Sequence, residues 1–289
     1  MQKQFELNCR GRLWSLQRPV IMGIINATPD SFYTRDRYVS LRDKEQLAAG
    51  MVEAGAAILD IGGMSTRPGA EEITLEEERS RVLPLIRSLK KAFPEILISI
   101  DTYRSRIAEE AVLAGADMVN DVSAGNMDPA MAEVVAALEV PFIAMHMQGT
   151  PRTMQQHPVY EDVAKDILDF FIKKITALEQ AGIRDIIIDP GFGFGKSLEH
   201  NYQLLGKLHT FSILEKPLLA GISRKSMLYR LLQISPDDAL NATTAANMLL
   251  LMQGAAILRV HDVREAAECV KLYEYYRQFL PEHIPLPEK

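Results

Sequence analysis

The 289-residue sequence predicts an α/β fold, a single (β/α)8 TIM barrel with a short N-terminal β-hairpin. Eight short apolar runs recur along the chain, and most are followed by a longer stretch with helical periodicity. Several runs, such as 96–100 and 186–188, are apolar throughout, which is typical of parallel strands buried on both faces. An open doubly wound sheet is the alternative, and eight strand-helix units favour the barrel.

The strands are expected, in order, at 20–26, 57–61, 96–101, 118–121, 141–146, 186–189, 217–221 and 256–260. Helices are expected at 44–54, 75–92, 104–114, 129–138, 159–181, 236–253 and 264–280. Glycines end four of these helical stretches just before the next strand: Gly55, Gly115, Gly182 and Gly254.

Residues 5–8 and 12–16 flank Cys9-Arg10-Gly11 and predict a hairpin that closes the bottom of the barrel. No linker rich in Pro, Gly or Ser divides the chain. We therefore expect one domain over 1–289, with the hairpin in 1–18 and the barrel in 19–281.

Composition narrows the range of partners. With 38 acidic and 32 basic residues, the formal net charge of -6 disfavours a nucleic-acid or anionic-membrane partner. No apolar run approaches the roughly 20 residues that span a bilayer. The 2 cysteines form no CxxC pair, so a reduced, cytoplasmic enzyme is expected.

A polar residue lies at the end of every predicted strand. These residues are Asn26, Asp60, Asp101, Asn120, His146, Asp189, Ser223 and Arg259. Turn formation explains roughly two or three of them, because Asp and Asn also favour turns. Since reactive groups in such barrels lie at the carboxyl ends of the strands, the set predicts a functional site there.

Two kinds of group are expected at this end of the barrel. Acceptor oxygens and an amide suit a flat heterocycle with several N–H donors, and they come from Asp101, Asn120 and Asp189. Cationic and donor groups suit a phosphate or pyrophosphate, and they come from Arg67, Lys225, Arg259 and His261.

The glycine-rich segment 189–197 is one residue short of a Walker A motif, because three rather than four residues separate Gly191 from Gly195. Its glycines instead allow the backbone to approach a planar ligand, with the Phe194 ring beside it, or they form an irregular strand-to-helix turn. No zinc-type spacing occurs among the 6 histidines. Any metal is expected to be Mg2+, held by substrate phosphates and one oxygen ligand such as Asn26.

Eight segments in order resemble the dihydropteroate synthases, a family of pterin-binding enzymes. They are MGIINATPDSF (22–32), DIGGMSTRPGA (60–70), SIDTYR (99–104), VNDVSAG (119–125), MHMQGTPRTMQ (145–155), IDPGFGFGK (188–196), GISRKSML (221–228) and ILRVHDV (257–263). The resemblance implies a transferase of folate biosynthesis, a homodimer, that joins (7,8-dihydropterin-6-yl)methyl diphosphate to 4-aminobenzoate. Diphosphate leaves first, and the amine then attacks a cation on the pterin methylene.

The resemblance also implies a role for each matching position. The pterin would contact Asp101, Asn120, Met145, Asp189, Gly193, Phe194 and Lys225. The diphosphate would contact Asn26, Thr66, Arg67, Arg259 and His261, with Asn26 also a ligand of Mg2+. The 4-aminobenzoate would contact Phe32, Pro68 and Ser223. Asp101, Lys225 and Arg67 would act in the chemical step.

The chain departs from the family pattern at three places. Segment 31–37 lacks the glycines usual there, Met64 replaces a common Glu, and Gln148 replaces a frequent Arg. Two alternatives remain open: a methyltransferase acting on methyltetrahydrofolate and a corrinoid protein, and a non-catalytic binding module. The apolar helix 240–252 is expected to pack against a second subunit.

Overall fold

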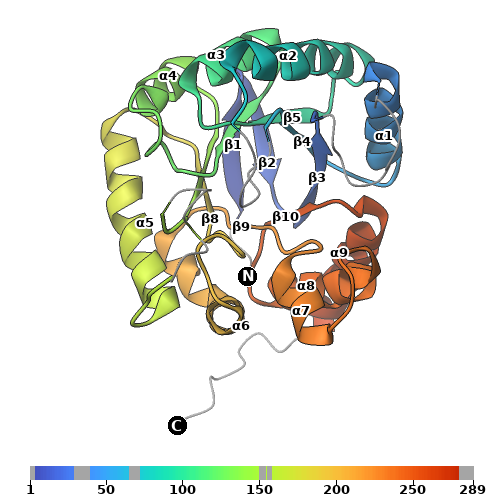
Figure 1. The fold of residues 1–289 in the computed structure, drawn as a ribbon, viewed down its shortest axis with the longest axis vertical. Helices are drawn as coiled ribbons and strands as arrows, with labels where there is room; N and C mark the ends of the chain where they lie inside the picture. Colours follow the sequence, from blue (N-terminus) through green and yellow to red (C-terminus); the bar gives the residue numbers. More distant parts are fainter. Residues whose placement is uncertain (1–3, 29–39, 65–71, 150–153, 155–157, 280–289) are drawn as a thin grey trace.

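Eight parallel strands form a nearly closed barrel in the computed structural model, which describes residues 4–28, 40–64, 72–149, 154 and 158–279 (Figure 1). The strand order is β8-β7-β6-β5-β4-β3-β10-β9, and a bridge between Ile188 and Leu218 joins the two ends of this order. The strands are β3 (Val20–Asn26), β4 (Ile58–Gly62), β5 (Leu97–Asp101), β6 (Met118–Asp121), β7 (Phe142–Met145), β8 (Ile186–Asp189), β9 (Leu219–Ala220) and β10 (Ile257–Val260).

Helices surround the strands (Figure 1). They are α1 (Leu41–Glu53), α2 (Leu75–Ala92), α3 (Ser105–Ala114), α4 (Met131–Leu138), α5 (Val163–Gln180), α6 (Leu198–Gly206), α7 (Ser226–Leu232), α8 (Leu240–Met252) and α9 (Val263–Tyr276). Short 3-10 segments lie at Leu208–Leu214, Asp237–Ala239 and Arg277–Phe279. All seven predicted helices are present, whereas α6 and α7 were not predicted.

Helix α5 begins later than its periodicity predicts because a cap fixes its start. The Asp162 side chain accepts hydrogen bonds from the backbone N–H of Ala164 and Lys165, at 3.0 and 3.3 Å. A side chain that satisfies these otherwise unpaired N–H groups marks the first turn of a helix.

The N-terminal hairpin closes the bottom of the barrel, as predicted. Strands β1 (Phe5–Cys9) and β2 (Arg12–Leu16) pair antiparallel, and their buried side chains join one apolar cluster with the lower ends of the barrel strands. The backbone N–H of Asn8 donates to Asp185 just before β8, at 3.0 Å. The hairpin is thus attached to the barrel by both apolar packing and a hydrogen bond.

The barrel interior changes from apolar to polar within two residues along five of the strands, β4, β5, β6, β8 and β10. Side chains at i and i+2 of a strand share a face. In β4, Ile58 belongs to the bottom cluster and Asp60 lies two residues further on; in β6, Met118 is followed in the same way by Asn120. The same change from an apolar to a polar side chain occurs from Leu97 to Ser99 in β5, from Ile187 to Asp189 in β8 and from Ile257 to Arg259 in β10. A polar layer therefore lies directly above the apolar floor.

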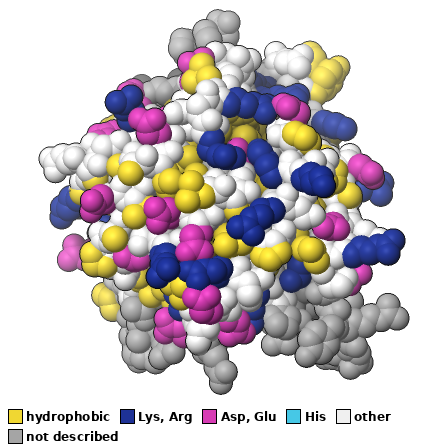
Figure 2. Space-filling model, turned by 90° about the horizontal axis from the view of Figure 1, so that it is seen from above, with side chains coloured by type: hydrophobic (Ala, Val, Ile, Leu, Met, Phe, Trp, Pro, Cys, Tyr) yellow, Lys and Arg dark blue, Asp and Glu magenta, His cyan; other side chains and the backbone are white. Residues whose placement is uncertain are grey.

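Both signs of charge are interspersed on the face drawn in Figure 2, where Lys and Arg do not form one continuous stripe. Among the residues that the structure describes, no helix is both long and apolar enough to cross a bilayer.

Candidate active site

Arg259 connects the carboxylates of two neighbouring strands. Its Nε donates to Asp60 Oδ2 at 2.6 Å, and its Nη2 donates to Asp101 Oδ2 at 2.7 Å. Asn120 Nδ2 donates to the same Asp60 oxygen at 3.1 Å. Strands β10, β4, β5 and β6 therefore bring one guanidinium, two carboxylates and one amide together, as their strand-end positions predict.

Burial raises the pKa values of two carboxyl groups in this site, Asp101 and Asp189. Burial raises the pKa of Asp101 from 3.8 to about 7, against the lowering effect of Arg259, and the nearby Asp60 raises it further. Burial also raises the pKa of Asp189, and Lys225 opposes this shift. The site thus holds a carboxyl group that titrates near neutral pH, which is a frequent property of catalytic groups.

Lys225 immediately precedes α7 and lies over the glycine-rich segment. Its Nζ donates to the backbone oxygen of Phe192 and stands 4.6 Å from the centroid of the Phe194 ring. Burial lowers the pKa of this lysine to about 8, and Asp189 opposes the shift. A Cβ added to Gly193, whose φ is +81°, would lie 3.2 Å from Lys225 Cδ, so the backbone at this position is close to the lysine.

The other two glycines of the segment are required by protein contacts. A Cβ on Gly191 would lie 2.0 Å from the His146 backbone oxygen, and one on Gly195 would lie 2.7 Å from the Gln148 backbone oxygen. Both have positive φ, at +71° and +62°. Close approach to a planar ligand therefore remains a prediction for Gly193 and does not explain Gly191 or Gly195.

The segments after β9 and β10 are joined by side-chain contacts. Ser223 Oγ lies 3.0 Å from His261 Nδ1 and accepts from the His261 backbone N–H at 3.2 Å. Arg224 Nε and Nη2 donate to the two oxygens of Asp262, each at 2.9 Å. This bidentate ion pair fixes the relative position of Ser223 and His261.

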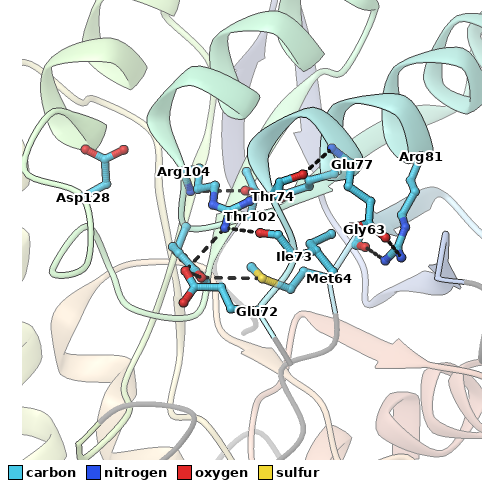
Figure 3. Close-up of polar contacts among 12 residues, drawn as sticks. Gly63, Met64, Glu72, Ile73, Thr74, Glu77, Arg81, Thr102, Arg104 and Asp128 are labelled. Carbon is cyan, nitrogen blue, oxygen red and sulfur yellow. Dashed lines mark hydrogen bonds and ion pairs between the residues drawn. The ribbon is translucent and has the colours of Figure 1, made fainter. Parts of the chain in front are cut away.

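A buried ion pair lies beside the carboxyl end of β5. Glu78 of α2 has no exposed surface and accepts from Thr102 Oγ1 at 2.7 Å and Arg104 Nη1 at 2.9 Å. Arg104 Nη2 donates to the Ile73 backbone oxygen at 2.6 Å (Figure 3). This network attaches the start of α2 to the residues that follow Asp101.

Two of the departures from the family pattern have partners in the structure. The Tyr103 hydroxyl donates to Glu72 Oε1 at 3.0 Å, and its oxygen lies 3.5 Å from Met64 Sδ. The Gln148 side chain bonds to the backbone of Val159 through both its amide atoms, at 2.9 and 3.0 Å. The third departure, in 31–37, lies outside the described residues.

Four predicted site residues also lie outside the described residues: Phe32, Thr66, Arg67 and Pro68. Asn26 ends β3, and Met145 ends β7 and is buried. Within the described ranges, no group of three or more His, Cys, Asp and Glu could hold a metal. Asp60 belongs to the predicted set of strand-end residues, but the sequence predicts no role for it in substrate binding or in the chemical step.

Comparison with known proteins shows the family to which the chain belongs. The family model described as pterin binding enzyme matches residues 22–261. The chain is 43% identical over 271 residues to the Escherichia coli (strain K12) dihydropteroate synthase, covering 93% of this chain and 95% of that one.

Two solved structures are similar along nearly the whole chain. A Yersinia pestis dihydropteroate synthase with a sulfonamide drug has a TM-score of 0.90 at 42% identity, covering 95% of this chain and 100% of that one. A Xanthomonas albilineans dihydropteroate synthase with 4-aminobenzoic acid has a TM-score of 0.89 at 39% identity, covering 96% and 100%. The chain therefore belongs to the pterin binding enzyme family, among the dihydropteroate synthases.

Proposed function

We propose that this chain transfers the dihydropterin-methyl group of (7,8-dihydropterin-6-yl)methyl diphosphate to the amine of 4-aminobenzoate, giving 7,8-dihydropteroate and diphosphate. The observation that carries the proposal is the polar layer in which Arg259 joins Asp60 and Asp101. This layer lies beside Asn120 and above an apolar floor. It offers both the acceptors for a pterin and the cations for a diphosphate.

The pterin ring would lie against Asn120, Asp189 and Met145, with the Phe194 ring at its side. Asp60 Oδ1 supports this placement, because it is buried and has no hydrogen-bond partner among the described residues. A buried acceptor without a partner is costly, and a ring N–H would satisfy it.

In the chemical step, charged side chains stabilise the charges that develop on the two reacting parts of the substrate. Diphosphate departs with the C–O bonding pair from the pterin methylene and leaves a cation. The amine nitrogen of 4-aminobenzoate forms the new C–N bond and then releases one proton. Asp101, when ionised, stabilises the cation, while Lys225, Arg259 and His261 together with Arg67 stabilise the departing negative charge. Each well-aimed group supplies about 3 kcal/mol in a site of this kind.

Magnesium is part of the proposal. The donor available at the end of β3 is the Asn26 side-chain oxygen, a hard ligand of the type that Mg2+ accepts alongside substrate phosphates. When bound, Mg2+ would neutralise charge on the leaving diphosphate.

The 4-aminobenzoate would lie near Ser223, with Phe32 and Pro68 completing its site. Ser223 is held by its contact with His261, so its hydroxyl has a defined position. Because a Yersinia pestis relative was solved with a sulfonamide drug, we also propose that sulfonamides bind where 4-aminobenzoate does.

The proposal further includes one domain, a cytoplasmic location and a homodimer. Both cysteines are free and buried, which is consistent with a reducing compartment. Along α8, exposed Leu249 and Met252, at 49% and 55%, continue a stripe begun by Asn241 and Ala245. Sedimentation velocity tests the dimer, and a Leu249→Asp variant should shift it to monomer.

One assay tests the activity. Purified protein with Mg2+, the dihydropterin diphosphate and 4-aminobenzoate should release diphosphate and form dihydropteroate in equal amounts, measured by chromatography. Pterin binding without product would favour the binding module. Methyl transfer from methyltetrahydrofolate to a corrinoid protein, without diphosphate release, would favour the methyltransferase.

A further inference from the structure

We propose that Lys196 is a positioning residue of the pterin pocket, whose side chain holds the glycine-rich segment 191–195 in the shape that Lys225 contacts. The inference rests on the proposed function, because it assigns the pterin to this pocket. Lys196 touches none of the reacting groups in that scheme and acts through the segment.

The Lys196 side chain is 4% exposed, and its Nζ has three acceptors. It donates to the backbone oxygens of Gly191 at 2.8 Å and Phe194 at 3.0 Å, and it lies 3.1 Å from His146 Nδ1. These contacts occupy all three N–H groups of an ammonium, and none of the acceptors is a carboxylate. Burial lowers the pKa of Lys196 to about 7, and Asp189 opposes this shift. Holding the amine out of water without a hydrogen-bonded carboxylate is therefore costly, so gain in stability alone does not account for it.

The partner histidine belongs to the end of the neighbouring strand. The His146 ring packs edge-on against Phe170, with centroids 4.9 Å apart, and the His146 backbone N–H donates to the backbone oxygen of Asp189 at 2.9 Å. Burial and the adjacent Lys196 lower the pKa of His146 to about 2, so the ring is neutral and its Nδ1 accepts. The lysine therefore joins the segment after β8 to the residue that follows β7.

The two carbonyls held by Lys196 bracket the part of the segment that faces Lys225. Phe192, whose oxygen accepts from Lys225 Nζ, lies between them in sequence, and so does Gly193. Gly193 N–H is held separately by Asn201 Oδ1 at 2.7 Å. Without the lysine, the Phe194 carbonyl would lose this donor, and the buried Gly191 carbonyl would keep only the Phe194 backbone N–H at 3.1 Å. The backbone at 191–194 would then rearrange to reach new partners.

Lys196→Met tests the inference, since methionine keeps the apolar stem and removes the donors. The matched control is Lys90→Met. Lys90 Nζ also has three contacts, to the Ile96 backbone oxygen and both oxygens of Asp117, at 2.8 to 3.1 Å. Lys90 lies at the opposite, amino end of the strands. The Lys90→Met variant therefore measures the stability lost when a lysine with three such contacts is removed far from the pocket.

The readouts are the affinity for the pterin alcohol 6-hydroxymethylpterin by calorimetry, steady-state kinetics and Tm. We expect Lys196→Met to weaken pterin binding at least about tenfold and to raise the KM for the dihydropterin diphosphate, whereas the KM for the amine substrate should change less than about twofold. Lys90→Met should lower Tm and leave pterin affinity unchanged.

Tyr160→Phe serves if the methionine variant does not fold. The Tyr160 hydroxyl donates to the Gly195 backbone oxygen at 2.8 Å, and its loss should weaken pterin binding about threefold. An unchanged pterin affinity in the folded variants would overturn the inference. A wild-type protein that binds pterin but forms no dihydropteroate refutes the proposed function alone, whereas one that binds no pterin refutes both.

Discussion

Replacing Asp101 by Asn should make the protein more stable at high pH and lower its kcat. The folded-state pKa of Asp101, about 7, lies above its ordinary value of 3.8 because the carboxyl is buried. Between these pH values the folded protein binds more protons than the unfolded chain, so stability falls as the pH rises through 7. The difference between the two pKa values corresponds to about 4 kcal/mol as an upper bound.

Asn cannot ionise, so the variant does not lose stability in this way as the pH rises. Its side-chain oxygen can still accept a hydrogen bond from Arg259. Relative to wild type, Asp101→Asn should gain stability with rising pH: its free energy of unfolding should become larger by about 3 kcal/mol between pH 5 and pH 8. The kcat of the variant should be about a hundredfold lower than that of wild type, because no carboxylate at this position stabilises the cation. The rise of wild-type kcat/KM through about pH 7 should disappear as well.

Urea unfolding followed by circular dichroism at pH 5 and pH 8 measures the stability difference, and diphosphate release measures kcat. A stability difference that is the same at both pH values would refute the reasoning, because it would mean that Asp101 does not titrate in this range. A kcat loss no larger than the loss in diphosphate affinity would count against the cation-stabilising role.

Three other changes have defined outcomes. Arg259→Ala should lower kcat/KM for the dihydropterin diphosphate at least about a hundredfold, and unchanged turnover would contradict the diphosphate site. Gly191→Ala should cost at least about 2 kcal/mol of unfolding free energy, because the added Cβ would lie 2.0 Å from a backbone oxygen, whereas Gly50→Ala, with open space around it, should not destabilise the protein. Arg104→Ala should cost about 3 kcal/mol by leaving Glu78 buried without its cation, and the loss should shrink in an added Glu78→Gln background, as urea unfolding can check.

The sequence predicts the barrel well because its strands are continuous apolar runs with little competing signal. Strands β3, β6 and β8 have the predicted bounds, and the others differ by one or two residues at their ends. Helices α6 and α7 were missed because each directly follows a polar segment, 195–197 and 223–225, that masks its periodicity.

The candidate site was predicted from strand ends, and that rule places Asp101, Asn120 and Arg259 together. It could not show that Asp60, which shares their strand-end position, is the common acceptor of Asn120 and Arg259, because hydrogen-bond partners depend on the radius and stagger of the barrel. Nor could it separate glycines required by neighbouring backbone from those available to a ligand. For Lys196, the motif position alone gives no sign of three buried acceptors.

The hairpin beneath the barrel limits the routes by which molecules reach and leave this site. Strands β1 and β2 fill the amino end of the barrel with apolar side chains such as Leu7 and Leu16, so that end offers no passage for a charged molecule. Both substrates must then enter, and both products leave, by the carboxyl end. The incoming amine and the departing diphosphate therefore share one end of the barrel, and neither can use the end that the hairpin fills.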